Sequence, residues 1–148
     1  MISFFPDLNV WLALSVAGHR HNAEAWNWLN FLPLETRLIF SRYTQVGLLR
    51  LLSNQPVMGE QALTLRKAWG AYDRWLSDPR VEFHPEPRGL DAGFRAATMR
   101  FAGLAASKTV GDCYLLAFAK QSGAALVTFD KALFDLARKE GHTAVVPA

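Results

Sequence analysis

The chain has 148 residues, of which 51% are hydrophobic and 20% are charged, a balance that excludes a disordered chain and favours one globular domain over residues 1–148. Its net charge is +3, and eleven of its 16 cationic residues are arginines, which suit phosphate contacts and weakly favour a polyanionic partner. A single cysteine excludes an intramolecular disulfide. We expect a cytoplasmic protein, because the sequence shows neither an apolar run of roughly 20 residues nor a signal-peptide pattern.

The first half of the chain is expected to alternate short buried strands with helices. The apolar runs predict strands at 2–5, 37–40 and 81–84 and helices at 10–16, 23–31, 41–53 and 60–76. Ser41 is expected to cap the helix that follows it, because serine accepts hydrogen bonds from the first amides of a helix. From Glu60 to Leu76, apolar residues recur at intervals of three and four, which predicts an amphipathic helix.

The second half of the chain continues the alternation. We expect helices at 90–101, 110–123 and 131–141 and strands at 125–129 and 143–146. The helix at 110–123 is apolar almost all round and ends at Gly123, a common C-terminal stop. Five short strands alternating with helices indicate a three-layer α/β/α domain with a short, mostly parallel five-stranded sheet.

Aspartates occupy the junctions where strands are expected to give way to helices. Asp7 and Asp130 each follow an apolar strand, the position at which open parallel sheets bind ligands. Asp112 lies in the first turn of the helix that precedes the strand ending at Asp130, so that helix end can approach the same edge. Each aspartate alone is explained more simply as a helix N-cap. Three aspartates at one pole of a sheet favour a functional site.

Clustered carboxylates repel one another and push one another toward protonation. A divalent hard cation removes that penalty, and Mg²⁺ or Mn²⁺ is expected because the chain offers no Cys and His set for zinc. Such an ion can activate water and neutralise charge on a phosphodiester, so an Arg-rich chain with this site is typical of a nuclease. His19 and His21 could also bind a metal, but we interpret them as solvated residues of the first loop.

Four segments of the chain resemble one known family in their order and spacing: FPDLNVWLAL, HRHNAEAWNWL, SRYTQVGLLRLL and VGDCYLLAFAKQSGAALVTFDKAL. They are similar to the PIN domain, and more narrowly to the VapC-type toxins of VapBC toxin–antitoxin pairs. This resemblance spans essentially the whole chain and implies a Mg²⁺- or Mn²⁺-dependent endoribonuclease. It also implies a homodimer that is held inactive by a cognate VapB-type antitoxin.

The resemblance also assigns roles to residues. By position, Asp7, Asp112 and Asp130 match the catalytic, metal-binding acids of the family, and Asn9 matches a small polar residue that supports the first of them. Family members commonly carry a glutamate in the third helix where this chain has Gly47, so a second or tightly bound metal becomes doubtful. Further candidates for contacts to these acids or to substrate phosphates, each of which also has an ordinary structural interpretation, are Arg42, Thr44, Gln45 and Thr128.

Two other functions stay open at the level of sequence. A PIN fold that binds RNA or a partner without cleaving anything would also fit, given Gly47. A phosphatase or phosphotransferase of the haloacid-dehalogenase type begins with an aspartate after its first strand, but it needs a second aspartate where this chain has Asn9. Tryptophans on helical faces indicate either core packing or an interface with a second copy or an antitoxin: Trp26, Trp28, Trp69 and Trp75.

Overall fold

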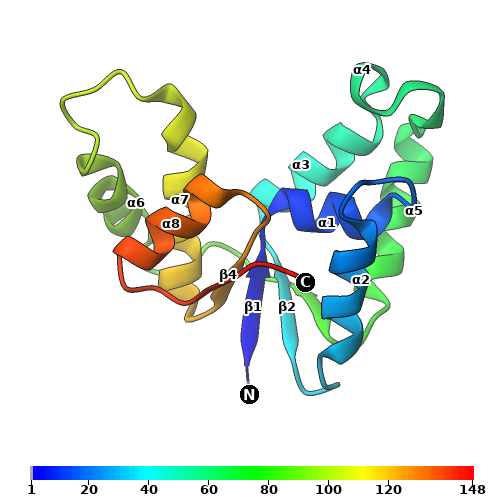
Figure 1. Ribbon diagram of the computed structural model, residues 1–148, viewed down its shortest axis with the longest axis horizontal. Helices are drawn as coiled ribbons and strands as arrows, with labels where there is room; N and C mark the ends of the chain where they lie inside the picture. Colours follow the sequence, from blue (N-terminus) through cyan, green and yellow to red (C-terminus); the bar gives the residue numbers. More distant parts are fainter. Residues whose placement is uncertain (1) are drawn as a thin grey trace.

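The computed structural model describes residues 2–148. This part of the chain contains one sheet of five short strands (Figure 1). The strands are β1 (Ser3–Pro6), β2 (Arg37–Phe40), β3 (Val81–Phe83), β4 (Ala125–Val127) and β5 (Ala144–Val145). They are ordered β3-β2-β1-β4-β5, and every neighbouring pair is parallel. The expected α/β fold is therefore confirmed, with a sheet that is entirely rather than mostly parallel.

Helices cover both faces of the sheet and complete the three layers (Figure 1). One face carries α1 (Leu8–Ser15), α2 (Asn22–Phe31), α3 (Arg42–Leu52) and α5 (Leu65–Leu76), and the other carries α6 (Leu90–Met99), α7 (Val110–Ser122) and α8 (Lys131–Lys139). Alternate residues of β2 face the two cores, because Leu38 and Phe40 pack in the first and Ile39 packs in the second. Within residues 2–148, no helix is both long enough and apolar enough to span a membrane.

The order of the strands creates a switch point between β1 and β4. The chain begins in the central strand β1, moves outward to β2 and β3, and then returns to the other side of β1 with β4. In open parallel sheets, ligands bind beside the carboxyl ends of strands at such a point. Asp7 directly follows β1, and its amide donates to the carbonyl of Val127 at the end of β4, 2.8 Å away. The topology therefore brings Asp7 close to the segment that ends at Asp130.

The expected helix over residues 60–76 begins five residues later than predicted. Thr64 is its N-cap, and the Thr64 side chain accepts a hydrogen bond from the amide of Lys67 at 3.3 Å. The preceding residues instead form the short helix α4 (Gln55–Met58) and a 3₁₀ turn at Gly59–Gln61. The amide of Leu63 donates to the carbonyl of Leu52 at 2.8 Å, which holds the connecting segment against the end of α3. The apolar spacing of three and four thus continues through residues that do not belong to the α-helix.

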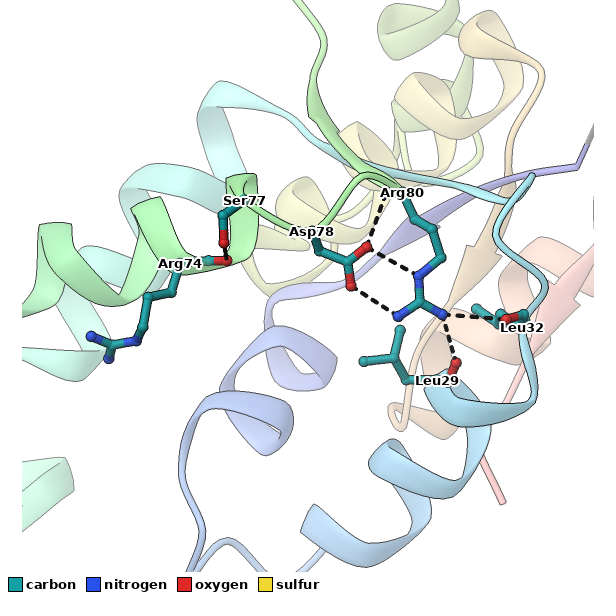
Figure 2. A network of polar contacts seen from close by, with 6 residues as sticks. All are labelled: Leu29, Leu32, Arg74, Ser77, Asp78 and Arg80. Atoms are coloured by element: carbon teal, nitrogen blue, oxygen red, sulfur yellow. Dashed lines mark hydrogen bonds and ion pairs between the residues drawn. The ribbon is translucent and has the colours of Figure 1, made fainter.

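Arg80, just before β3, connects that strand to the end of α2 (Figure 2). Its guanidinium pairs with Asp78 at 2.8 Å and donates to the carbonyls of Leu29 and Leu32 at 3.0 and 3.3 Å. The last carbonyls of a helix have no intrahelical donor, so Arg80 satisfies acceptors that would otherwise be unpaired. The hydrogen bonds from Arg80 hold the pKa of Asp78 below its usual value.

Arg80→Met is expected to lower the free energy of unfolding by about 2–3 kcal/mol, because it leaves Asp78 and the α2 carbonyls without their cationic donor. Since the folded pKa of Asp78 is lowered, this loss should be complete at neutral pH and should shrink as the pH falls below 3.8. Arg74→Met is the matched control, because within residues 2–148 the Arg74 guanidinium has no hydrogen bond or ion pair. Urea denaturation measures both variants, and equal losses would contradict the prediction.

Candidate active site

Asp7 caps helix α1 and is bound through both of its carboxylate oxygens. One oxygen accepts a hydrogen bond from the amide of Leu8 at 2.6 Å, and the other accepts from the hydroxyl of Thr128 at 2.8 Å. The side chain is buried, and burial raises the pKa of Asp7. The hydrogen bonds from Thr128 and Leu8 oppose this rise, whereas the charge of Asp130 adds to it. Asp7 is therefore a helix cap whose ionised form is disfavoured by burial and by the charge of Asp130.

Thr128 connects the ends of β1 and β4. Besides donating to Asp7, its fully buried hydroxyl accepts hydrogen bonds from the side-chain amide of Asn9 at 3.3 Å and from the backbone amide of Asp130 at 3.0 Å. The carbonyl of the Asn9 side chain accepts from the backbone amide of Phe129 at 3.2 Å. One donated and two accepted bonds use the full capacity of a hydroxyl. Thr128 and Asn9 thus fix the position of Asp7 relative to Asp130.

Asp130 and Asp112 present carboxylate oxygens that are less engaged. Asp130 is exposed, caps α8, and accepts a hydrogen bond from the amide of Leu133 at 3.1 Å. Asp112 lies in the first turn of α7, and its carboxylate has no hydrogen bond or ion pair within residues 2–148. Partial burial, together with the charges of Asp130 and Asp7, raises the pKa of Asp112 to about 6. The three carboxylates therefore act as one electrostatic group.

The donor chemistry of this group fits a hard divalent cation. It consists only of carboxylate oxygens, the ligands that Mg²⁺ and Mn²⁺ prefer, and their mutual repulsion is the energy that a bound cation would relieve. Within residues 2–148, however, no three or more His, Cys, Asp and Glu side chains are already arranged to hold an ion. Shared ligation by all three aspartates would therefore require their side chains to reorient, and the unpaired carboxylate of Asp112 is the one with the fewest contacts to break.

Three other candidate residues lie at the start of α3 and contact other groups. Thr44 is buried and forms a reciprocal capping box with Ser41, as expected for the cap of this helix. Gln45 is also buried and accepts a hydrogen bond from Arg42 at 2.6 Å. The Arg42 guanidinium lies 4.6 Å from the ring centre of Phe83. In the described part of the chain, no hydrogen bond or ion pair joins Arg42, Thr44 or Gln45 to the three aspartates.

Gly47 lies where α3 approaches the start of α1. A Cβ atom at Gly47 would be 2.6 Å from Cδ2 of Leu8, the residue that follows Asp7. Glycine is therefore favoured here by the close approach of Leu8, a contact that the sequence alone did not reveal. Because the obstructing atom is the end of a flexible side chain, a larger residue requires Leu8 to move but not the backbone.

Gly47→Ala is expected to gain less stability in the wild-type chain than in a Leu8→Ala background. Helix propensity favours alanine by about 1 kcal/mol, and in the wild-type chain the displacement of Leu8 offsets this gain. A double-mutant cycle measured by chemical denaturation isolates the contact between the two residues. The same gain in both backgrounds would show that Leu8 does not obstruct residue 47.

Asp112→Asn is expected to stabilise the metal-free protein above pH 6. Because the folded pKa of Asp112 is raised from 3.8 to about 6, ionisation costs folding stability as the pH rises through that window, and both states are protonated below it. The gain from asparagine should therefore be largest above pH 6 and vanish below pH 3.8. Thermal unfolding in EDTA between pH 3.5 and 8 measures the effect, with Asp73→Asn on the exposed face of α5 as the control. A pH-independent difference would contradict the raised pKa of Asp112.

Two hollows in this region of the surface were not anticipated from the sequence. Asp112 lines one of about 400 Å³ together with Arg100 and Lys139, and Leu8 and Gly47 line another of about 430 Å³. Arg100 pairs with Glu140, whereas Lys139 forms no ion pair within residues 2–148. No sequence motif marks the first hollow, because its residues come from the segment after α6, from α7 and from α8, and they meet only in the folded chain.

Comparison with known proteins relates this arrangement to one family. The model of the PIN domain matches residues 4–139. Ribonuclease VapC41 of Mycobacterium tuberculosis (strain H37Rv) is 42% identical over 130 residues, which cover 85% of this chain and 88% of that protein. Ribonuclease VapC39 of the same strain is 33% identical over 134 residues, which cover 88% of this chain and 91% of that protein.

Solved structures agree with these sequence relations at the level of the fold. The toxin–antitoxin complex VapBC2 of Rickettsia felis, solved with a DNA fragment from its promoter, has a TM-score of 0.72 at 15% identity, covering 99% of this chain and 100% of the matched chain. VapC20 of M. tuberculosis, a toxin that cleaves the sarcin–ricin loop, has a TM-score of 0.67 at 18% identity, covering 95% of this chain and 96% of that one. With the family model spanning most of the sequence, these matches establish that the chain belongs to the PIN domain family.

Proposed function

We propose that the protein is a metal-dependent endoribonuclease and the toxin of a type II toxin–antitoxin pair. The observation that carries this proposal is the electrostatic group formed by Asp7, Asp112 and Asp130 at the switch point of the sheet. It is supported by 42% identity to a protein that is named a ribonuclease. Carboxylates that raise one another's pKa values are typical of sites that bind cations or transfer protons.

The three aspartates would hold Mg²⁺ or Mn²⁺, which supplies charge neutralisation at the phosphodiester and a more acidic water. Thr128 would orient Asp7, because its hydroxyl donates to the Asp7 carboxylate and is itself held by the side-chain amide of Asn9. Asp112 is largely ionised above pH 6 and is then available as an oxygen donor. Lys139, which lines the same hollow as Asp112 and forms no ion pair within residues 2–148, offers a cationic group to a phosphate of the RNA strand.

The proposed partners follow from the toxin assignment. We expect an RNA substrate, a cognate VapB-type antitoxin that covers the site, a homodimer and a cytoplasmic location. The tryptophans offer partial support for an interface, since Trp28 is buried in the core whereas Trp26 and Trp69 are 38% and 46% exposed on α2 and α5. Co-expression with the neighbouring small reading frame should yield a stable complex that no longer cleaves RNA.

A phosphatase or phosphotransferase is less well supported by the geometry. Such an enzyme needs an acid at position 9, and here the Asn9 side chain instead bonds Thr128 and the amide of Phe129. A PIN domain that binds RNA without cleaving it is the remaining alternative, and only an activity measurement separates it from a nuclease.

Labelled single-stranded RNA incubated with purified protein tests the proposal. Cleavage is expected in Mg²⁺ or Mn²⁺, absent in excess EDTA, and restored when the cation is added back. RNA that is bound but never cleaved in either cation would favour the non-catalytic alternative. Undiminished cleavage in EDTA would overturn the metal-dependent mechanism.

A further inference from the structure

A groove of about 430 Å³ lies between α3 and α7, and its wall reaches the residues adjacent in sequence to two of the three aspartates. Leu8, which directly follows Asp7, forms part of its wall. The hydroxyl of Tyr43 packs against Gly111, where a Cβ atom would be 2.7 Å away, and Gly111 immediately precedes Asp112. The groove therefore adjoins the proposed reaction centre.

An aromatic side chain is held in position in this groove. Tyr43 is 45% exposed, and its ring stacks on that of Tyr114 with centroids 5.0 Å apart and planes inclined by 29°. Tyr114 is in turn fixed by an edge-on contact with Phe94 and by a hydrogen bond from its hydroxyl to Glu86 at 2.9 Å. Tyr43 is thus supported by Tyr114 while nearly half of its surface stays open to solvent.

Two cations line the same groove without acidic partners. Arg42 and Arg50 both belong to α3, and neither forms an ion pair within residues 2–148. The only side-chain hydrogen bond of Arg42 in that part of the chain goes to the neutral amide of Gln45. The one carboxylate in the groove, Glu86, accepts the hydroxyl of Tyr114. An exposed ring beside unpaired arginines is the combination with which proteins bind single-stranded nucleic acids.

We propose that this groove binds the RNA strand next to the cleaved phosphodiester, with one unpaired base stacked on Tyr43 and the backbone phosphates near Arg42 and Arg50. This inference rests on the proposed ribonuclease function and names the form of RNA that reaches the site. A base within an A-form helix has no free face to stack on a side chain, so the groove selects single-stranded or looped segments. Stacking on Tyr43 tolerates any base, and it therefore positions the strand without reading its sequence.

Fluorescence anisotropy of a labelled single-stranded oligoribonucleotide, titrated with protein in EDTA, measures binding without cleavage. Tyr43→Ala is expected to raise Kd about tenfold, and Tyr43→Phe, which keeps the ring, should change it less than about twofold. Arg50→Gln is expected to weaken binding and to reduce the slope of log K against log salt by about 0.7. Arg66→Gln is the matched control, because Arg66 is exposed on α5 outside the groove.

The outcomes separate this inference from the function on which it rests. Binding that depends on Tyr43 and Arg50, in a protein that does not cleave RNA in Mg²⁺ or Mn²⁺, would support the groove and refute the nuclease. Cleavage with equal Kd values for wild type and Tyr43→Ala would refute the groove alone. Should Tyr43→Ala fail to fold, Arg50→Gln still tests the inference. The exposed Arg50 side chain has no hydrogen bond within residues 2–148, so its replacement should leave the fold intact. A salt slope of Arg50→Gln equal to that of Arg66→Gln would overturn the inference.

Discussion

Asp112→Asn is expected to lower the rate of RNA cleavage by about 100-fold or more. Replacing a residue that hydrogen-bonds to a metal ligand typically lowers activity 10- to 100-fold, so replacing the ligand itself should have at least that effect. The same substitution should stabilise the metal-free protein above pH 6, since it removes a carboxylate whose pKa burial and its neighbours raise to about 6. A variant that is inactive and yet more stable cannot owe its inactivity to unfolding.

Cleavage assays under single-turnover conditions, with thermal unfolding of the same samples, measure both effects of Asp112→Asn. Asp73→Asn, on the exposed face of α5, is the control for the loss of one negative charge. Activity within a few-fold of wild type for Asp112→Asn would remove this residue from the proposed ligand set.

Thr128→Val is expected to lower the cleavage rate by about 10- to 100-fold although all three aspartates are retained. The variant is isosteric and deletes the hydroxyl that donates to Asp7 and accepts from Asn9 and the amide of Asp130. Because the Thr128 hydrogen bond lowers the pKa of Asp7, its loss should raise that pKa further and move the acidic limb of the activity profile to higher pH. The free energy of unfolding should fall by about 1–3 kcal/mol, since partners of a buried hydroxyl are left unpaired.

The pH dependence of kcat/KM for wild type and Thr128→Val checks this prediction. Thr36→Val is the matched control, because Thr36 is a buried threonine that precedes β2 at the amino end of the sheet. A rate loss without any shift of the acidic limb would mean that Thr128 acts on stability alone and does not tune Asp7.

Much of the fold could be predicted from local patterns. Each strand is a short apolar run bounded by turn residues, and the switch between periods of two and 3.6 places the helices between them. The pattern failed before Leu65, where apolar residues keep a helical spacing but the backbone is held instead by contacts with the end of α3. Periodicity reports which side chains are buried, and several backbone conformations can bury the same residues.

The candidate site could be predicted in part. The placement of Asp7 and Asp130 after strands follows from the topology of a parallel sheet, which needs only the order of elements. The bonds of Thr128 could not be foreseen, because they join residues that lie 119 and 121 positions apart in the chain. The contact between Gly47 and Leu8 depends likewise on the spacing of two helices. The sequence of α3 shows only an arginine and a tyrosine at its start. The groove itself forms between α3 and α7, so it depends on how these two helices pack in the folded chain.

A crystal structure of the protein soaked with Mn²⁺, with anomalous diffraction recorded at the manganese edge, tests the central claim most directly. The account predicts one strong anomalous peak between the carboxylates of Asp7, Asp112 and Asp130, with the Asp112 side chain turned toward it and the peak absent in Asp112→Asn crystals. A peak at His19 and His21, or a protein that cleaves RNA while no manganese lies near the three aspartates, would contradict it.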